Sequence, residues 1–160
     1  MNHAIPNVVP QDVLLAHDGI SFLQGIIDGK FPPPPIAETL GFRLALVERG
    51  RVQFESDPQP RHYNPIGTVH GGLALTLLDS ALACAVHSTL GRGEAYTSVE
   101  IKVNFVRPLT ARTGPIVAEG RVLHRGRTIA TSEGEVKDRG GKLYAHATTT
   151  CMIFPSRQER

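Results

Sequence analysis

The chain has little of what several protein classes require. Its 160 residues include only two cysteines, Cys84 and Cys151, which sit among apolar or small residues and lack a CxxC spacing. We interpret them as buried free thiols rather than as a disulfide or metal ligands. The close, paired spacing of a zinc site is also missing among four of the histidines, His62, His87, His124 and His146. The sequence therefore indicates neither a metal site nor a disulfide framework.

Long apolar runs and strong net charge are missing as well. No apolar stretch approaches the length of a membrane span, and residues 1–13 lack the basic and apolar regions of a secretion signal. Seventeen basic and fifteen acidic side chains leave a formal charge of +2, which is weak for a nucleic-acid binder. We expect a cytoplasmic protein with no membrane or nucleic-acid partner. No GxSxG elbow occurs, which argues against serine hydrolase chemistry.

The length and the composition fit one folded domain with an N-terminal extension. Of the residues, 41% are hydrophobic and 20% are charged, close to the averages for globular proteins. Pro10 can open a helix, and apolar residues then recur at helical spacing, which predicts a helix near residues 11–28. Prolines 32–35 predict an extended connector. We divide the chain into residues 1–35, the helix and connector, and residues 36–160, the main domain.

The main domain combines alternating segments with one long helical run. Residues 42–57 alternate around Arg49-Gly50 and predict a β-hairpin. Residues 73–90 are apolar on almost every side, which predicts a buried helix. Period-two alternation returns in four later segments, near 99–105, 116–122, 128–136 and 143–151. This order predicts an α+β fold in which an antiparallel sheet carries the long helix on one face.

One charged residue interrupts the long helix. Asp79 lies in the run Leu-Leu-Asp-Ser-Ala-Leu, where burial of an unpaired carboxylate would be costly. It is either a core residue bonded to a hydroxyl such as Thr76 or Ser80, or a reactive carboxylate in a cleft.

A second candidate feature stands directly before the long helix. In Thr-Val-His-Gly-Gly, residues 68–72, backbone N–H groups and the helix dipole favour negative charge, as at an oxyanion site. The glycine pair can instead merely clear space for packing. Asn64 can orient a thioester carbonyl or a water molecule, although Asn64-Pro65 also fits an ordinary turn.

Together these segments resemble a known family. Residues 64–72, Asn-Pro-Ile-Gly-Thr-Val-His-Gly-Gly, with Asp79 nine residues after His70, resemble the PaaI-like hotdog thioesterases of the phenylacetic-acid-degradation type. Residues 98–108 and 126–133 also match that pattern, so the likeness covers most of the main domain. It implies a hotdog fold, a curled antiparallel sheet wrapped around one long helix, and hydrolysis of acyl-CoA thioesters without a metal or separate cofactor.

The resemblance also implies roles for individual residues. Asp79 matches the catalytic carboxylate and Gly71 the oxyanion amide, while Asn64 and His70 match the polar groups that orient the thioester. Ser98 matches the hydroxyl that helps to hold the attacking water, with Thr97 beside it as an alternative. Whether the carboxylate activates water or attacks the thioester itself stays open.

The CoA part of such a substrate needs its own contacts. Gly72 continues the backbone site for the substrate, and cationic side chains are needed at the rim for the phosphates. By charge and loop position, the cationic candidates are Arg107, Arg125, Arg127 and Lys142. Each of these can equally be an ordinary solvated surface charge. Few aromatic and many small residues on the helix fit either an aryl-acetyl group or a medium acyl chain.

Spacing along the helix bears on assembly. Gly71 and Asp79 are eight residues apart, which on one helix is roughly 12 Å. An oxyanion donor and an attacking group must each lie within about 3 Å of the reacting carbon, so we predict an obligate homodimer with two composite sites. Pairing of two dimers into a tetramer stays open.

Two other functions compete with thioester hydrolysis. A hotdog hydratase or dehydratase would need an acid and base pair, but His87 lies two helical turns beyond Asp79. A non-catalytic acyl-CoA binding module would keep the pocket without needing the carboxylate.

Overall fold

The computed structural model describes residues 6–156 of the chain. Its helices are α1 (Gln11–Leu15), α2 (Gly19–Ile27), α3 (Pro35–Leu40) and α4 (Gly71–His87). The strands are β1 (Phe42–Glu48), β2 (Arg51–Ser56), β3 (Glu94–Phe105), β4 (Ile116–Arg125), β5 (Ile129–Asp138) and β6 (Leu143–Pro155). Two short 3-10 turns, Pro60–His62 and Ala111–Thr113, lie in the loops on either side of α4 and β3.

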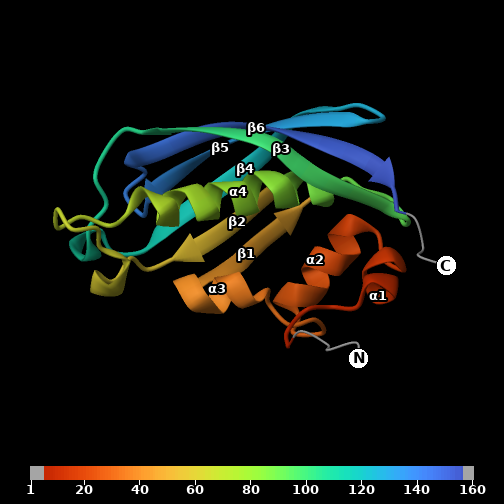
Figure 1. The fold of residues 1–160 in the computed structure, drawn as a ribbon, viewed down its shortest axis with the longest axis horizontal. Coiled ribbons are helices and arrows are strands. Elements are labelled where there is room, and N and C mark those ends of the chain that lie inside the picture. Colours follow the sequence, from red (N-terminus) through yellow and green to blue (C-terminus); the bar gives the residue numbers. More distant parts are fainter. Residues whose placement is uncertain (1–5, 157–160) are drawn as a thin grey trace.

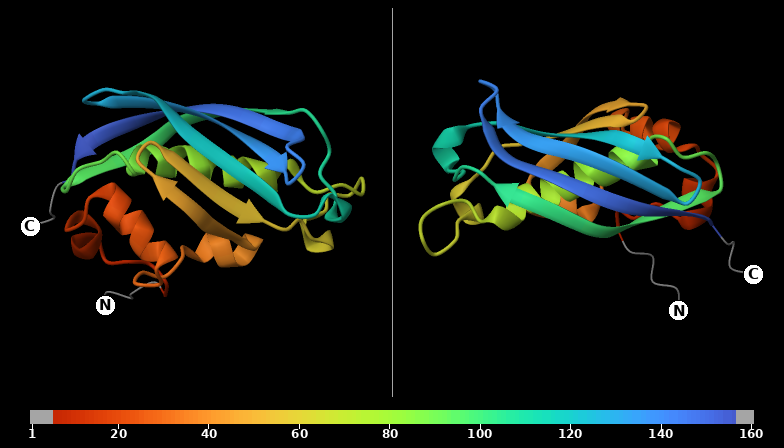
Figure 2. Two further views of the ribbon diagram at one scale, coloured as in Figure 1. Left: turned by 180° about the vertical axis from the view of Figure 1, so that it is seen from behind. Right: turned by 90° about the horizontal axis from the view of Figure 1, so that it is seen from above.

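All six strands form one antiparallel sheet in the order β1-β2-β4-β5-β6-β3. The sheet curls around α4, which crosses its inner face (Figures 1 and 2). This is the hotdog arrangement that the resemblance implied, so the predicted fold is confirmed. In this order β1 and β3 are the two edge strands of the sheet.

Close contact between α4 and the sheet depends on small residues in the neighbouring strands. Gly120 on β4 pairs with Gly134 on β5, and a Cβ atom at Gly120 would lie only 2.4 Å from the carbonyl oxygen of Ala81. Glycine therefore lets the helix backbone approach the sheet backbone directly. The side of α4 that faces the sheet is apolar and buried, through Leu73, Ala74, Leu77, Leu78, Ala81, Leu82, Ala85 and Val86.

The strand predictions agree with the structure, and the long helix begins two residues earlier than expected. The hairpin turns at Arg49-Gly50, and the last three strands turn near residues 126–128 and 139–142, as predicted. Strand β3 begins at Glu94 rather than near Val99.

The N-terminal segment differs from its prediction. The single helix expected at residues 11–28 is wrong, because the chain breaks after α1 and restarts as α2. The Asp18 side chain caps α2 by accepting a hydrogen bond from the Ser21 N–H at 2.9 Å. The Gly19 N–H donates to the carbonyl of Leu90 at 3.0 Å, which holds the start of α2 against the end of α4 (Figure 1).

The proline connector also holds a helix that the sequence did not predict. Pro35 occupies the first turn of α3, where its missing N–H costs nothing, and Gly41 ends the helix with a left-handed φ of 67°. Helices α2 and α3 both contact β1.

Within residues 6–156, no helix is long and apolar enough to cross a membrane. In the same part of the chain, no group of histidine, cysteine, aspartate and glutamate side chains is placed to hold a metal ion. Both cysteines are free thiols.

Candidate active site

The loop before α4 is organised by the side chain of Asn64. Its Oδ1 accepts hydrogen bonds from the N–H groups of Ile66 at 3.1 Å and Thr68 at 3.2 Å. Its Nδ2 donates to the Thr68 hydroxyl at 3.0 Å. The Asn64 side chain therefore stabilises the turn, and one hydrogen of its amide group is left for another partner.

His70 caps the helix and fixes its own orientation. Its Nδ1 accepts a hydrogen bond from the Gly72 N–H at 2.8 Å, so the ring hydrogen of the neutral imidazole lies on Nε2. Gly72 thus gives its N–H to the cap rather than to a substrate. The Gly71 N–H has no acceptor among the described residues. It is the free donor at the positive end of α4.

This end of the helix opens onto a hollow of about 440 Å³. Asn64, His70 and Gly71 line it together with Phe105 and Tyr144. A Cβ atom at Gly71 would lie 3.1 Å from the ring of Phe105, so this ring packs directly over the glycine. The sequence does not mark Phe105 for this place, because the alternation of its strand indicates only which face of the sheet a residue takes.

The four basic candidates do not form one patch within the chain. Arg107 lines the hollow beside Gly71 and donates to the Leu143 carbonyl at 2.7 Å, close to Lys142 in the β5–β6 turn. Arg125 ends β4 and Arg127 lies in the β4–β5 turn, both at the opposite end of β5.

Arg125 is already engaged. One of its nitrogens lies 2.8 Å from each carboxylate oxygen of Glu94. Partial burial raises the pKa of Glu94, whereas the bond to Arg125 lowers it. The pKa of Glu94 lies below its ordinary value as a result. Arg125 is therefore the least available of the four for a phosphate group.

Asp79 lies on a side of α4 that the sheet does not cover. The prediction that this helix is buried on every side is wrong for the single chain, because Asp79 is exposed and Leu75 is 37% exposed. The sheet curls around α4 but leaves the side of the helix that faces the viewer uncovered (Figure 1).

Asp79 has one side-chain hydrogen bond among the described residues, and its partner is a hydroxyl on the neighbouring strand β3. The hydroxyl of Ser98 donates to Asp79 Oδ1 at 3.4 Å. Thr76 donates instead to the Gly72 carbonyl at 2.9 Å, so it is not the partner of a core aspartate. The neighbouring Thr97 is exposed and its hydroxyl lies toward the Ser98 carbonyl. Of the two adjacent hydroxyls, Ser98 is the one beside the carboxylate.

A row of aromatic rings connects this carboxylate region with the N-terminal segment. Tyr96 contacts His87 with ring centres 5.2 Å apart, and His87 contacts Phe22 at 5.6 Å. Phe22 stacks on Phe31 at 5.0 Å. Burial in this stack lowers the pKa of His87 to about 4. His87 is thus a buried packing residue whose neutral ring is favoured.

The site residues therefore form two groups in one chain. Asn64, His70 and Gly71 lie together at the start of α4, and Asp79 and Ser98 lie together further along it. The two groups are separated by roughly 12 Å of helix. One thioester carbon cannot contact both groups of the same subunit.

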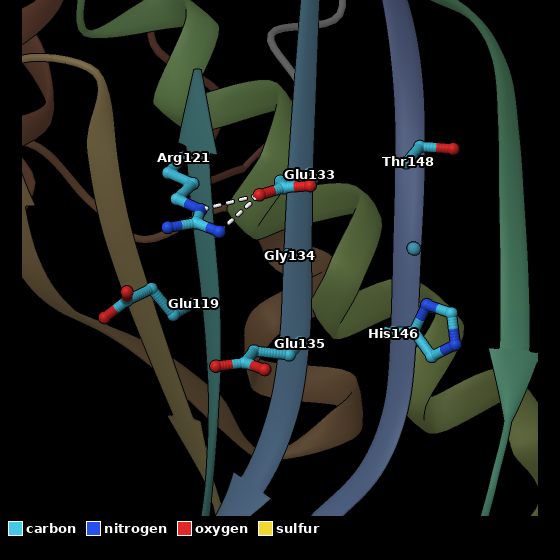
Figure 3. A pocket seen from close by; sticks show the side chains of 8 residues that line it. Glu119, Arg121, Glu133, Gly134, Glu135, His146 and Thr148 are labelled. Carbon is cyan, nitrogen blue, oxygen red and sulfur yellow. Dashed lines mark hydrogen bonds and ion pairs between the residues drawn. The ribbon is translucent and has the colours of Figure 1, made fainter. Parts of the chain in front are cut away.

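A polar cluster on the outer face of the sheet is separate from these groups (Figure 3). It forms a hollow of about 220 Å³ over β4, β5 and β6, and the Arg121 guanidinium contacts Glu133 there. Gly120 and Gly134 face α4, so the residues that alternate with them, Glu119, Arg121, Glu133 and Glu135, point away from it. The cluster is on the wrong face to meet a substrate bound at Gly71.

Comparison with known proteins settles the family. The sequence pattern of the thioesterase superfamily matches residues 66–145, the stretch that contains Gly71, Asp79 and Ser98. The chain belongs to the thioesterase superfamily. This thioesterase is a thioester hydrolase, which sets aside the hydratase and the binding-module alternatives.

Individual relatives agree with this assignment. The thioesterase is 35% identical over 109 residues to human acyl-coenzyme A thioesterase 13, covering 67% of this chain and 76% of the relative. It is 32% identical to a phenylacetic acid degradation-related protein of Ralstonia eutropha JMP134, with a TM-score of 0.74 and coverage of 82% and 98%. The PaaI protein of E. coli, 21% identical, shares the fold with a TM-score of 0.75 and coverage of 89% and 97%. The resemblance to PaaI-like thioesterases is confirmed.

Proposed function

We propose that this thioesterase hydrolyses acyl-CoA thioesters carrying an aryl-acetyl group or a medium acyl chain. The observation that carries the proposal is the free Gly71 N–H at the start of α4, opening onto an apolar hollow with Arg107 at its edge. The names of the human and Ralstonia relatives support acyl-CoA and an aryl-acetyl group, respectively.

In the proposed reaction the thioester carbonyl accepts a hydrogen bond from the Gly71 N–H. The Nε2–H of His70 lies at the same helix end and orients the substrate, while Asn64 holds the loop in shape. Negative charge grows on the carbonyl oxygen as the tetrahedral intermediate forms, and the amide and the helix dipole stabilise it. One such donor typically contributes about 3 to 4 kcal/mol.

Asp79 supplies the attacking group. As a general base it takes a proton from a water molecule whose oxygen bonds to the thioester carbon. The carbon–sulfur bond then breaks, and the CoA thiolate leaves and is protonated. As a nucleophile it would form a mixed anhydride that water then cleaves. Ser98 holds one carboxylate oxygen in either case.

The proposed assembly is a homodimer in which each site takes Gly71 from one subunit and Asp79 from the other. Strand β3 is an edge strand, and edge strands offer unpaired backbone groups to a partner. Exposed apolar side chains accompany this edge and the open side of α4: Leu75 is 37% exposed, Val99 54% and Phe105 56%. A second copy would cover them and bring the two groups of site residues together.

For the CoA phosphates we propose Arg107, Lys142 and Arg127. Arg107 and Lys142 lie at the Gly71 end of the sheet, and Arg127 lies in the β4–β5 turn at the other end. In a two-fold dimer with antiparallel β3 edges, opposite ends of the two subunits face the same side of the interface.

Thiol release from a panel of CoA thioesters tests the proposal. The panel pairs phenylacetyl-CoA with straight-chain thioesters from acetyl to lauroyl, and wild type is compared with Asp79→Asn and Asp79→Ala. We expect hydrolysis by wild type and a loss of at least about a hundredfold in kcat for both variants as folded dimers. If the variants match wild type, Asp79 is not the reactive carboxylate.

A further inference from the structure

A fully buried thiol lies directly behind the Ser98 hydroxyl. Cys151 on β6 is cross-strand partner to Ser98 on β3, and its Sγ lies 3.9 Å from Ser98 Oγ. Ser98 Oγ in turn lies 3.4 Å from Asp79 Oδ1. The three side chains form one line from the core of the sheet to the open side of α4.

The shape of strand β3 allows Ser98 to contact both Cys151 and Asp79. The register of β3 against β6 shifts between Ser98 and Glu100, which marks a β-bulge immediately after Ser98. Bulges bend a strand and re-aim the side chains beside them. The pairing of Ser98 with Cys151 precedes the bulge, so the hydroxyl keeps its contact with the thiol while it reaches the carboxylate.

The numbers of available donors and acceptors decide which atom donates between Cys151 and Ser98. A serine hydroxyl has one hydrogen to donate and two lone pairs to accept with, whereas an ionised carboxylate only accepts. Ser98 must therefore donate to Asp79, which leaves its lone pairs for a donor from the other side. The Cys151 S–H is the donor placed there, and burial raises the pKa of this thiol, so it keeps its hydrogen.

Cys151 also has apolar neighbours. It packs in a small cluster with Val86, Leu90, Ala130 and Ile153. The other thiol, Cys84, is also close to the carboxylate, but no hydrogen bond joins it to Ser98 among the described residues. Cys84 therefore offers a matched comparison: a second cysteine near Asp79 that does not touch the hydroxyl.

We propose that Cys151 is a positioning residue, whose S–H donates to Ser98 Oγ and thereby directs the Ser98 hydrogen onto Asp79. The proposal rests on the proposed roles of Asp79 and Ser98. Without the thiol the hydroxyl can rotate away, and the carboxylate is held less firmly for attack. Because a thiol is a weak donor, the effect on turnover is modest, about three- to tenfold.

Steady-state kinetics of five variants test this. Cys151→Ala is expected to lower kcat about three- to tenfold with an unchanged KM, and Cys151→Ser to restore kcat because a hydroxyl also donates. Cys84→Ala is expected to stay within about twofold of wild type. In the Ser98→Ala background, adding Cys151→Ala should cause no further loss, because the group it positions is gone.

The free energy of unfolding of each variant distinguishes a positioning role of Cys151 from a packing role. If Cys151 only fills space, serine in that apolar pocket restores nothing, and kcat follows the free energy of unfolding across the variants. That result, or an unchanged kcat in Cys151→Ala, overturns the proposal. A further loss in the Ser98→Ala background overturns it as well. If wild type hydrolyses no thioester, the proposed function has failed, and if Asp79→Asn remains active, the proposed role of Asp79 has failed. If wild type is active, Asp79→Asn is inactive and Cys151→Ala is not impaired, only this inference has failed.

Discussion

Gly71 and Asp79 lie on the same helix, eight residues apart, and face different neighbours. Gly71 opens onto the hollow under Phe105, and Asp79 lies on the open side of α4 against Ser98. About 12 Å of helix separates them, so in the proposed mechanism one chain supplies two half-sites rather than one site. This relationship supports an active dimer, and it makes each half-site separately testable.

The oxyanion donor can be removed without losing the helix. Gly71 is the first residue of α4, a position that favours proline, and His70 before it has φ −59° and ψ 133°, which proline accepts in its predecessor. We expect Gly71→Pro to fall about a hundredfold below Gly71→Ala in kcat, because only proline lacks the N–H. Both variants add a Cβ near Phe105, so their ratio isolates the donor. Equal rates, measured by thiol release, would remove Gly71 from the mechanism.

Much of the fold could be predicted because its periodicities are strong. The hairpin at Arg49-Gly50, the later strands and the long helix all follow from period-two and helical patterns. The break between α1 and α2 was missed although Asp18 offers an N-cap there, because the contact of Gly19 with the distant Leu90 leaves no sequence signal. Helix α3 was hidden by the preceding prolines, which indicate an extended chain.

The site was predicted less completely than the fold. The motif nominated Gly71, His70 and Asp79, whose roles stay predictions. Of the two interpretations of Asn64, the structure shows the turn, because its side chain bonds within its own loop. Phe105 gave no signal, because its place over Gly71 depends on how the sheet curls. The apolar character of α4 on all sides was read as burial within the chain, whereas one side is open in the subunit.

The docking of α2 on α4 depends on the absence of a side chain at Gly19. A Cβ atom there would lie 1.7 Å from the His87 carbonyl oxygen, which is backbone and cannot move aside cheaply. We expect Gly19→Ala to lower the free energy of unfolding by about 3 kcal/mol. Gly91→Ala is the control, since its Cβ would meet only a Glu94 oxygen at 3.6 Å. Equal urea midpoints for the two variants, measured at the same protein concentration, would contradict this expectation.

His87 should make stability depend on pH. Burial lowers its pKa to about 4 from an ordinary 6.5, so below pH 6.5 the unfolded chain binds a proton that the folded chain refuses. Its contribution to stability is therefore lost as pH falls from about 6.5 toward 4. Between pH 7 and pH 5 we expect wild type to lose about 2 kcal/mol more than His87→Phe, which keeps a ring in the stack. Urea unfolding at both pH values measures this difference. An equal loss of unfolding free energy in the two proteins would contradict the prediction.

The arginines should differ in their effect on CoA binding. Arg107 lies at the hollow, so Arg107→Ala is expected to raise KM about tenfold, the scale of one lost charge-assisted hydrogen bond. Arg125→Ala is expected to leave KM within about twofold, because that side chain is held by Glu94. Initial rates over a range of thioester concentrations give both values. A larger KM effect at Arg125 would reverse the assignment.

Activity of a mixed dimer tests the composite site most directly. Differently tagged Asp79→Asn and Gly71→Pro subunits are co-expressed, and the dimer carrying both tags is isolated. If each site joins Gly71 of one subunit with Asp79 of the other, the mixed dimer has one intact site and one doubly defective site. We then expect about half of the wild-type kcat, far above either parent. A mixed dimer no more active than its parents would place both residues of a site in one subunit and contradict the account.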